Sequence, residues 1–397
     1  MNKNIKLAVA GAVLALSATA NAGIIIPAGE WTIDINGNVN AFAITNSMKG
    51  NNDITGGMAT RYDDNNRNDT QGINTGLLPA WLGVTGTTRQ NDVDTSFTIS
   101  LQPGVSNNSA AGSASTNVEY RQAFLTFGDK SWGSIKLGKD LGIFASDAIL
   151  NDMTLLGVGA MSGTTTTTSH PGSGTTTTYG GIGTGYIYAA WKGQVAYTTP
   201  NFNGFQATVG IVNPNQASMN ELYQERYGLE GKASYAFTGD ALNGKIWVSG
   251  ASYKMTFAST PEFTASVGDV GANINAGSIG VTGYYYKGEG VGTTVIGGNN
   301  HYSGAKRDSD GGYLQGTFTL PTKTKIGLAY ATSKLDRATG ESAALVVKEN
   351  KRYTMGAYHP LTKHLNLVAE YSRVESEAQN SVSNENNVAS VGGILFF

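Results

Sequence analysis

Apolar and polar residues alternate with a period of two along most of the chain. In residues 93–102, for example, Phe97, Ile99 and Leu101 alternate with Thr98 and Ser100. Because successive side chains of a β-strand point to opposite faces, such a segment predicts a strand with one apolar and one polar face. Apolar stripes with the 3.6-residue period of a helix do not extend over useful lengths. The chain is therefore predicted to be all-β.

The connectors between these segments are alternately short and long. Short turns such as 89–92 and 199–203 alternate with long polar stretches such as 45–78 and 141–186. This asymmetry is typical of a transmembrane antiparallel β-barrel, which has turns at one rim and loops at the other. A single-chain barrel has an even number of strands, and we predict sixteen. The pattern is weakest in residues 263–288, so fourteen or eighteen strands remain alternatives. The sixteen predicted strands are 30–44, 79–88, 93–102, 118–128, 133–140, 187–198, 204–213, 226–238, 245–258, 263–272, 277–288, 312–320, 324–333, 351–359, 364–376 and 388–397.

Residues 1–22 have the pattern of a secretory signal peptide. Lys3 and Lys6 precede an apolar run that ends at Leu16, and residues 20–22 read Ala-Asn-Ala, a signal-peptidase site. The apolar run is too short for a membrane anchor, which needs about 20 residues. We expect the exported chain to begin at Gly23 and to form one barrel domain over residues 23–397.

The composition fits a barrel better than a soluble enzyme. The chain has 53 glycines in 397 residues and only 14% charged residues, where average proteins have about 7% glycine and about 25% charge. Charge is costly on the lipid-facing half of every strand. The absence of cysteine excludes disulfides, thiolate metal sites and cysteine nucleophiles. The formal net charge of −2 becomes −4 when Lys3 and Lys6 are removed, which argues against nucleic-acid binding and predicts a mild preference for cations.

Several motifs resemble those of the general-diffusion porins of Gram-negative outer membranes. The resemblance implies an outer-membrane location, contact with the lipid bilayer and lipopolysaccharide, a homotrimer, and a third loop, here Leu141–Tyr186, that folds into the barrel and narrows it. The terminal phenylalanine is similar to the family's assembly signal. The motifs are Ala80–Gly86, Tyr120–Leu125, Trp132–Lys139, Val195–Phe205, Tyr358–Lys363 and Phe397.

The same resemblance indicates which residues line the constriction. It places Asp152 and Asp147 on the acidic side of the third loop, and Arg121 on the basic wall that faces it. The alternation adds Lys136 and Lys192, which have the inward parity of their strands.

The chain departs from the family pattern in two places. Trp81 stands where many members carry an arginine, and Leu156-Gly157 replaces the usual glutamate of the loop. Both changes would weaken the transverse field of the constriction, and an aromatic side chain there could stack on a sugar or an aromatic solute.

The function predicted from these features is passive diffusion of small hydrophilic solutes and ions through a water-filled channel, without a cofactor. A substrate-selective porin with a saturable solute site remains an alternative. A barrel enzyme or adhesin is a weaker one, since only His301, Ser303 and Asp308 lie near one another in the sequence. The four histidines, His170, His301, His359 and His364, stand in different loops or turns, so no metal site is expected.

Overall fold

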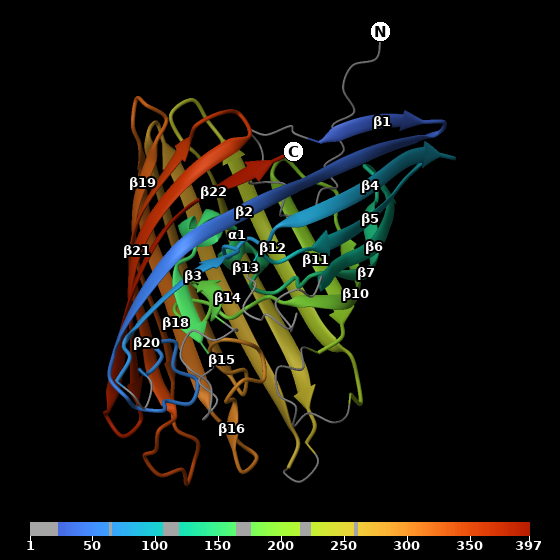
Figure 1. Cartoon of the computed structure of the whole chain (residues 1–397). Helices are drawn as coiled ribbons and strands as arrows, with labels where there is room; N and C mark the ends of the chain where they lie inside the picture. The colour runs from blue at the N-terminus through green and yellow to red at the C-terminus, as the bar shows by residue number, and fades with distance from the viewer. Residues whose placement is uncertain (1–22, 63–65, 106–118, 164–175, 215–223, 258–260) are drawn as a thin grey trace, which may run out of the picture.

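A computed structural model gives the fold, and it describes residues 23–62, 66–105, 119–163, 176–214, 224–257 and 261–397. In the described residues, sixteen antiparallel strands form a closed ring (Figure 1). The strands of the ring are β2 (Trp31–Lys49), β4 (Trp81–Gln90), β5 (Val93–Gln102), β6 (Glu119–Asp129), β7 (Gly133–Leu141), β10 (Trp191–Thr198), β11 (Phe205–Val212), β12 (Gly228–Thr238), β13 (Asn243–Met255), β14 (Phe263–Ala276), β15 (Ile279–Glu289), β18 (Asp308–Thr319), β19 (Lys325–Leu335), β20 (Val347–Pro360), β21 (Leu365–Ala378) and β22 (Ser383–Phe396).

The ring closes on β2, which pairs with β22 along one edge and with β4 along the other. A closed ring leaves no unpaired strand edge, and this allows a β-structure to cross a bilayer. The prediction of an all-β barrel with sixteen strands is confirmed. Each predicted segment overlaps one strand of the ring, and β5 has the predicted bounds. The predicted beginning of the fourth segment, residue 118, and the predicted end of the ninth segment, residue 258, lie outside the described residues.

The two faces of the strands follow the predicted alternation. On β18 and β19 the outward side chains include Leu314 and Leu328, which are exposed, whereas the inward Tyr313 and Gln315 are buried. Over the ring as a whole the outward positions are largely apolar, and asparagine, serine and threonine recur at the inward ones. The outer face therefore suits lipid and the inner face suits water and polar loop segments.

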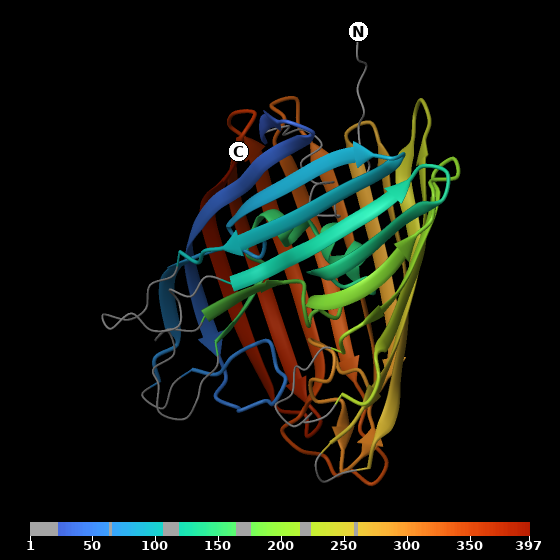
Figure 2. The same ribbon diagram turned by 90° about the vertical axis from the view of Figure 1, so that its right-hand side faces the viewer.

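The wall is low on one side and tall on the other. β7 and β10 have 9 and 8 residues, whereas β20, β21 and β22 have 14 each. The low side, which contains β4 to β7, faces the viewer in Figure 2. The long connection between β7 and β10 starts and ends on this side.

The remaining elements are short. β1 (Ile24–Ala28) and β3 (Asp69–Asn74) pair with β2, and both were missed by the sequence pattern. The connection between β7 and β10 contains α1 (Ser146–Leu150), the 3-10 helix η3 (Met153–Leu156) and the hairpin of β8 (Ala160–Gly163) with β9 (Thr176–Gly180). β16 (His301–Tyr302) pairs with β17 (Ala305–Lys306). In the described part of the chain, no helix has the length and apolar character needed to cross a bilayer.

Candidate functional site

The site consists of the β7–β10 segment (residues 141–163 and 176–190) and the wall side chains that hold it. The segment leaves β7 beside Glu230 of β12. One carboxylate oxygen of Glu230 accepts hydrogen bonds from the backbone N–H groups of Ile143 and Phe144, at 2.6 and 2.9 Å. The other accepts from Lys192 Nζ at 2.7 Å and from the Tyr253 hydroxyl at 2.6 Å. The side chains of Glu230 and Lys192 are 0% and 3% exposed, so this carboxylate is a buried anchor.

Helix α1 follows and brings Asp147 to two lysines of the wall. α1 begins after Ala145, whose φ of 59° turns the chain in the left-handed region. The Asp147 carboxylate pairs with Lys232 of β12 at 3.1 Å and with Lys245 of β13. Burial acts to raise the pKa of Asp147, but the two ammonium groups outweigh burial and hold the pKa below its ordinary value. Asp147 therefore stays ionised.

The middle of the segment is held by β18. The Tyr313 hydroxyl donates to the Ala148 carbonyl at 2.8 Å. The Gln315 amide accepts from Met153 N at 2.9 Å and donates to the Asn151 carbonyl at 2.7 Å. These bonds satisfy backbone groups at the ends of both short helices, which would otherwise lack partners.

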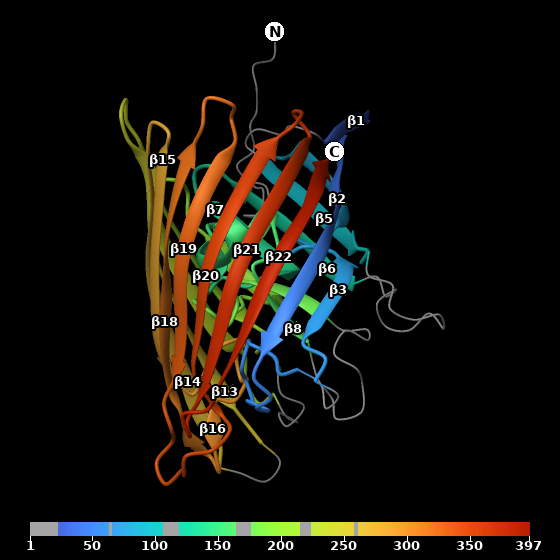
Figure 3. The same cartoon turned by 60° about the vertical axis from the view of Figure 1, so that its left-hand side comes forward.

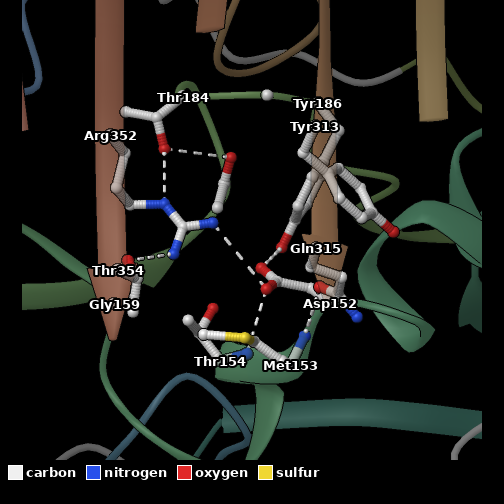
Figure 4. A network of polar contacts seen from close by, with 12 residues as sticks. Asp152, Met153, Thr154, Gly159, Thr184, Tyr186, Tyr313, Gln315, Arg352 and Thr354 are labelled. Carbon is white, nitrogen blue, oxygen red and sulfur yellow. Dashed lines mark hydrogen bonds and ion pairs between the residues drawn. The ribbon is translucent and has the colours of Figure 1, made fainter. Parts of the chain in front are cut away.

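Asp152 lies at the centre of a second polar network (Figure 4). Its carboxylate caps η3 by accepting from Thr154 N at 3.0 Å and accepts from the Tyr186 hydroxyl at 2.9 Å. Arg352 of β20 lies 3.7 Å from the same carboxylate, and both side chains are 1% exposed. Arg352 Nε also donates to the Thr184 hydroxyl at 3.2 Å. Burial and the adjacent carboxylate together raise the pKa of Tyr186 well above its ordinary value, so the phenol remains a donor.

A wall carboxylate also holds the far end of the segment. Glu370 of β21 accepts from Val158 N and Gly159 N at 2.7 and 2.8 Å and from the Tyr358 hydroxyl at 2.6 Å. A side chain at Gly157 would collide with the Glu370 carboxylate. At Gly157, one of the two positions of the departure noted above, the wall glutamate therefore fills the space that a side chain would need.

The predicted site residues are only partly brought together. Asp147 and Asp152 both meet cationic side chains of the wall, but the partners are Lys232, Lys245 and Arg352. Lys136 pairs with Asp140 of its own strand, and Lys192 pairs with Glu230. Arg121 pairs with Glu119 on its own strand at 2.6 Å, and no contact between it and either loop aspartate is found in the described residues.

Trp81 lies on the inner face of β4, beside the seam of the ring. Its indole N–H donates to the Asn36 side chain at 3.2 Å, and its ring meets Phe396 edge to face at 6.2 Å. The side chain is partly buried. Trp81 is therefore positioned by β2 and β22.

Sequence reasoning missed Glu230, Glu370, Arg352, Lys232 and Lys245. Their inward parity was the only available signal, and most polar residues of the barrel share it. No group of three histidine or acidic side chains suited to a metal ion occurs in the described residues. His301 Nδ1 accepts a hydrogen bond from Gly304 N, and its ring packs on Phe257.

Comparison with known proteins agrees with this architecture. A sequence profile described as Gram-negative porin matches residues 7–379. The comparison with curated protein sequences finds no significant match. Among solved structures, the chain is similar to the outer-membrane channel DcaP of Acinetobacter baumannii, with 13% identity, a TM-score of 0.67, and 94% and 99% of the two chains covered.

Two further structures have similar folds. An anion-selective porin from Comamonas acidovorans has 13% identity, a TM-score of 0.62 and coverage of 93% of this chain and 100% of its own. OmpF of Salmonella typhi has 14% identity, a TM-score of 0.61 and coverage of 94% and 100%. At these identities the likeness shows the fold, and the profile match shows the family. The chain belongs to the Gram-negative porins and is an outer-membrane channel for passive diffusion.

Proposed function

We propose that the β7–β10 segment narrows the channel and that small anions pass more readily than cations. The segment is held by five strands of the ring, β12, β13, β18, β20 and β21. It is therefore a fixed obstacle rather than a mobile lid. The observation that carries the ion preference is an asymmetry in the exposure of opposite charges.

The wall lysines reach solvent while their counter-charges do not. The side chains of Lys136, Lys232 and Lys245 are 26%, 20% and 34% exposed. The carboxylates that they contact, Asp140 and Asp147, are each 5% exposed. A solute in the lumen therefore meets ammonium groups before it meets carboxylates. Charges that line a narrow pore select ions at short range, whereas charges elsewhere on the protein are screened over about 8–10 Å in physiological salt.

This proposal differs from the mild cation preference expected from the net charge of −4. Net charge counts every acidic residue of the chain, including Glu385 and Glu377, which pair with Lys49 and Lys348 and not with Lys136, Lys232 or Lys245. The fold of the anion-selective porin from Comamonas acidovorans is similar, which supports the proposal only as a precedent for this architecture.

The test is the reversal potential of the reconstituted channel across a planar bilayer in a KCl gradient. We expect the reversal potential to have the sign of an anion-selective pore. Replacing Lys136 and Lys245 with glutamine should move the reversal potential toward that of a cation-selective pore. Lys232 remains in that variant to pair with Asp147. Lys139→Gln is the matched control, because Lys139 lies on the opposite face of β7 and donates to the Tyr120 carbonyl. A cation-selective wild type would refute the proposal.

A substrate-selective porin is the second candidate, and Trp81 is the observation that favours it. An indole ring fixed on the inner wall is a surface on which a sugar or an aromatic solute stacks. Selective binding would appear as concentration-dependent block of single channels by the solute, whereas general diffusion gives a flux that rises linearly with concentration.

We propose that the protein is not an enzyme and that it assembles as a homotrimer. His301 is engaged by Gly304 and Phe257 rather than by a serine or a carboxylate, which argues against a hydrolytic triad at the loops. A trimeric form of the similarly folded OmpT of Vibrio cholerae supports the trimer. Bilayer lipid and lipopolysaccharide are the proposed partners of its outer surface.

A further inference from the structure

One edge of β2 is paired by two different strands with a gap between them. β4 pairs with β2 over residues 32–38, and β3 pairs with it over residues 42–47. Figure 3 shows β3 alongside β2, on the side away from β22. In the described part of the chain, residues 39–41 have no strand partner on this edge. The β3–β4 connector (residues 75–80) crosses the gap, and its six residues span a stretch that three would cover in an unbroken strand.

The surplus length of the connector lies against the inner face of β2, where two asparagines hold it. Asn40 Nδ2 donates to the Leu78 carbonyl at 2.9 Å, and Asn40 Oδ1 accepts from Gly76 N at 2.8 Å. Asn38 Nδ2 donates to the Pro79 carbonyl at 2.9 Å. The interior of a large barrel is polar and wet, yet these two inward asparagines are only 1% and 2% exposed. The connector therefore separates them from the water of the lumen.

The other side of the connector is bonded to the β7–β10 segment. Leu77 N donates to the Gly157 carbonyl at 2.8 Å, and Leu78 N donates to the Leu155 carbonyl at 3.2 Å. An added Cβ on Gly76 would lie 2.6 Å from the Gly157 oxygen, so the two backbones approach more closely than a side chain at position 76 would allow. Leu78 and Leu155 are buried in the same apolar cluster. The connector thus fills the space between β2 and this part of the β7–β10 segment.

We propose that the β3–β4 connector is a second constricting element of the channel and that Asn40 is its positioning residue. The inference rests on the proposed narrowing by the β7–β10 segment and adds what limits solute size beside β2. An extended chain takes up about 4.8 Å between its neighbours, so the connector removes about this width from the lumen next to η3. The connector has no charged side chain, so it restricts solutes by size and leaves the ion preference to other residues.

The test is polymer exclusion on the reconstituted channel. Neutral polyethylene glycols of graded size lower the conductance only when they are small enough to enter the pore. Asn40→Ala leaves Gly76 N and the Leu78 carbonyl without their side-chain partner, so the connector should loosen. We expect this variant to conduct more and to admit larger polymers than the wild type, with a gain in passable diameter of at most about 4.8 Å. The reversal potential should keep its sign.

Asn46→Ala is the matched control. Asn46 is also an inward, buried asparagine of β2, and its Oδ1 has no hydrogen-bond partner in the described residues. An unchanged polymer cut-off in Asn40→Ala, or an equal change in Asn46→Ala, would overturn the role of the connector. A wild type that admits polymers as wide as an open barrel would overturn the narrowing by the β7–β10 segment as well, so the two failures are distinguishable.

A second measurement leaves Asn40 in place. The chain has no cysteine, so a single introduced thiol can be labelled with a charged, water-soluble thiosulfonate and the attachment verified by mass spectrometry. Leu77 is a partly buried residue of the connector, whereas Gln71 is exposed on the outward side of β3. We expect labelling of Leu77→Cys to lower the single-channel conductance and labelling of Gln71→Cys to leave it unchanged. A Leu77→Cys variant that does not react, or that reacts without a loss of conductance, would contradict the inference.

Discussion

Replacing Glu230 with glutamine tests whether wall carboxylates hold the β7–β10 segment. The substitution preserves size and one acceptor oxygen, so Ile143 N and Phe144 N keep a partner. It removes the counter-charge of Lys192, whose side chain is 3% exposed. Breaking a buried ion pair by removing one partner costs about 3–5 kcal/mol. Because the acceptor for the two backbone groups is retained, we expect a loss near the lower end, about 3 kcal/mol.

A double-mutant cycle separates the ion pair from the backbone bonds. Lys192→Met leaves Glu230 with its backbone donors and Tyr253, and the double variant has no unpaired charge. We expect the double variant to lose about 2 kcal/mol less than the sum of the single losses, because contacting residues couple by about 0.5–3 kcal/mol. Glu385→Gln is the control, since that carboxylate pairs with the exposed side chains of Lys49 and Arg373 and each such pair contributes about 0–1 kcal/mol.

The assay is equilibrium unfolding in urea of the barrel folded into lipid vesicles, followed by tryptophan fluorescence. Single-channel recordings on the same samples report on the β7–β10 segment itself. If Glu230→Gln loosens the end of this segment at Ile143 and Phe144, the open-channel current should become noisier. Strict additivity of the two single substitutions, or a Glu230→Gln loss no larger than that of Glu385→Gln, would refute the anchoring role.

Three further predictions concern other parts of the molecule. Hydrogen bonds from Arg307 hold the pKa of Glu341 in the folded protein below its ordinary value of 4.5. The Arg307–Glu341 pair therefore stabilises the two loops that it joins above pH 4.5, and this contribution is lost as the pH falls through the lowered pKa of Glu341. Protease cleavage between residues 334 and 346 should rise below pH 4.5 in the wild type, and Glu341→Gln should abolish that dependence. Gly138→Ala should destabilise the barrel by about 1–3 kcal/mol, because Gly138 has a φ of 126° and an added Cβ would collide with the Ala123 carbonyl. Gly316→Ala is the control in the same urea titration and should be neutral, because a Cβ there meets open space. Trp81→Arg should change conductance and solute flux, and unchanged values would place Trp81 outside the constriction.

The barrel could be predicted from the sequence wherever an apolar outer face marks a strand. β5 has the predicted bounds because its alternation is complete and the tight turn at Asn91-Asp92, with φ of 48° and 61°, ends the preceding strand. β22 begins at Ser383, five residues before the predicted start. Its first inward residues are Asn384 and Asn386, which bond to Asn52 and Thr60 of a loop segment, and such polar residues give no hydrophobic signal.

The candidate site could be predicted only in outline. Asp147 and Asp152 were identified through the loop to which they belong, and the structure pairs both with cations of the wall. Which cations they meet depends on the stagger between strands far apart in the sequence, and alternation contains no information about stagger. Arg121 illustrates the limit, since a break in regular pairing between β5 and β6, near Ser100 and Gln102, changes the register just where Arg121 stands.

Burial, rather than charge count, decides what a solute meets in this channel. Asp147, Asp152, Glu230 and Glu370 are all withdrawn from solvent because backbone N–H groups, phenols or cations occupy their oxygens. Carboxylates used in this way hold the β7–β10 segment and add little to the field in the lumen. In the proposed ion preference, the lysines that reach water set the sign of that field, although the chain has a formal net charge of −2. A porin can therefore carry more acidic than basic residues and still favour anions, provided that its acidic groups are the ones that hold the structure together.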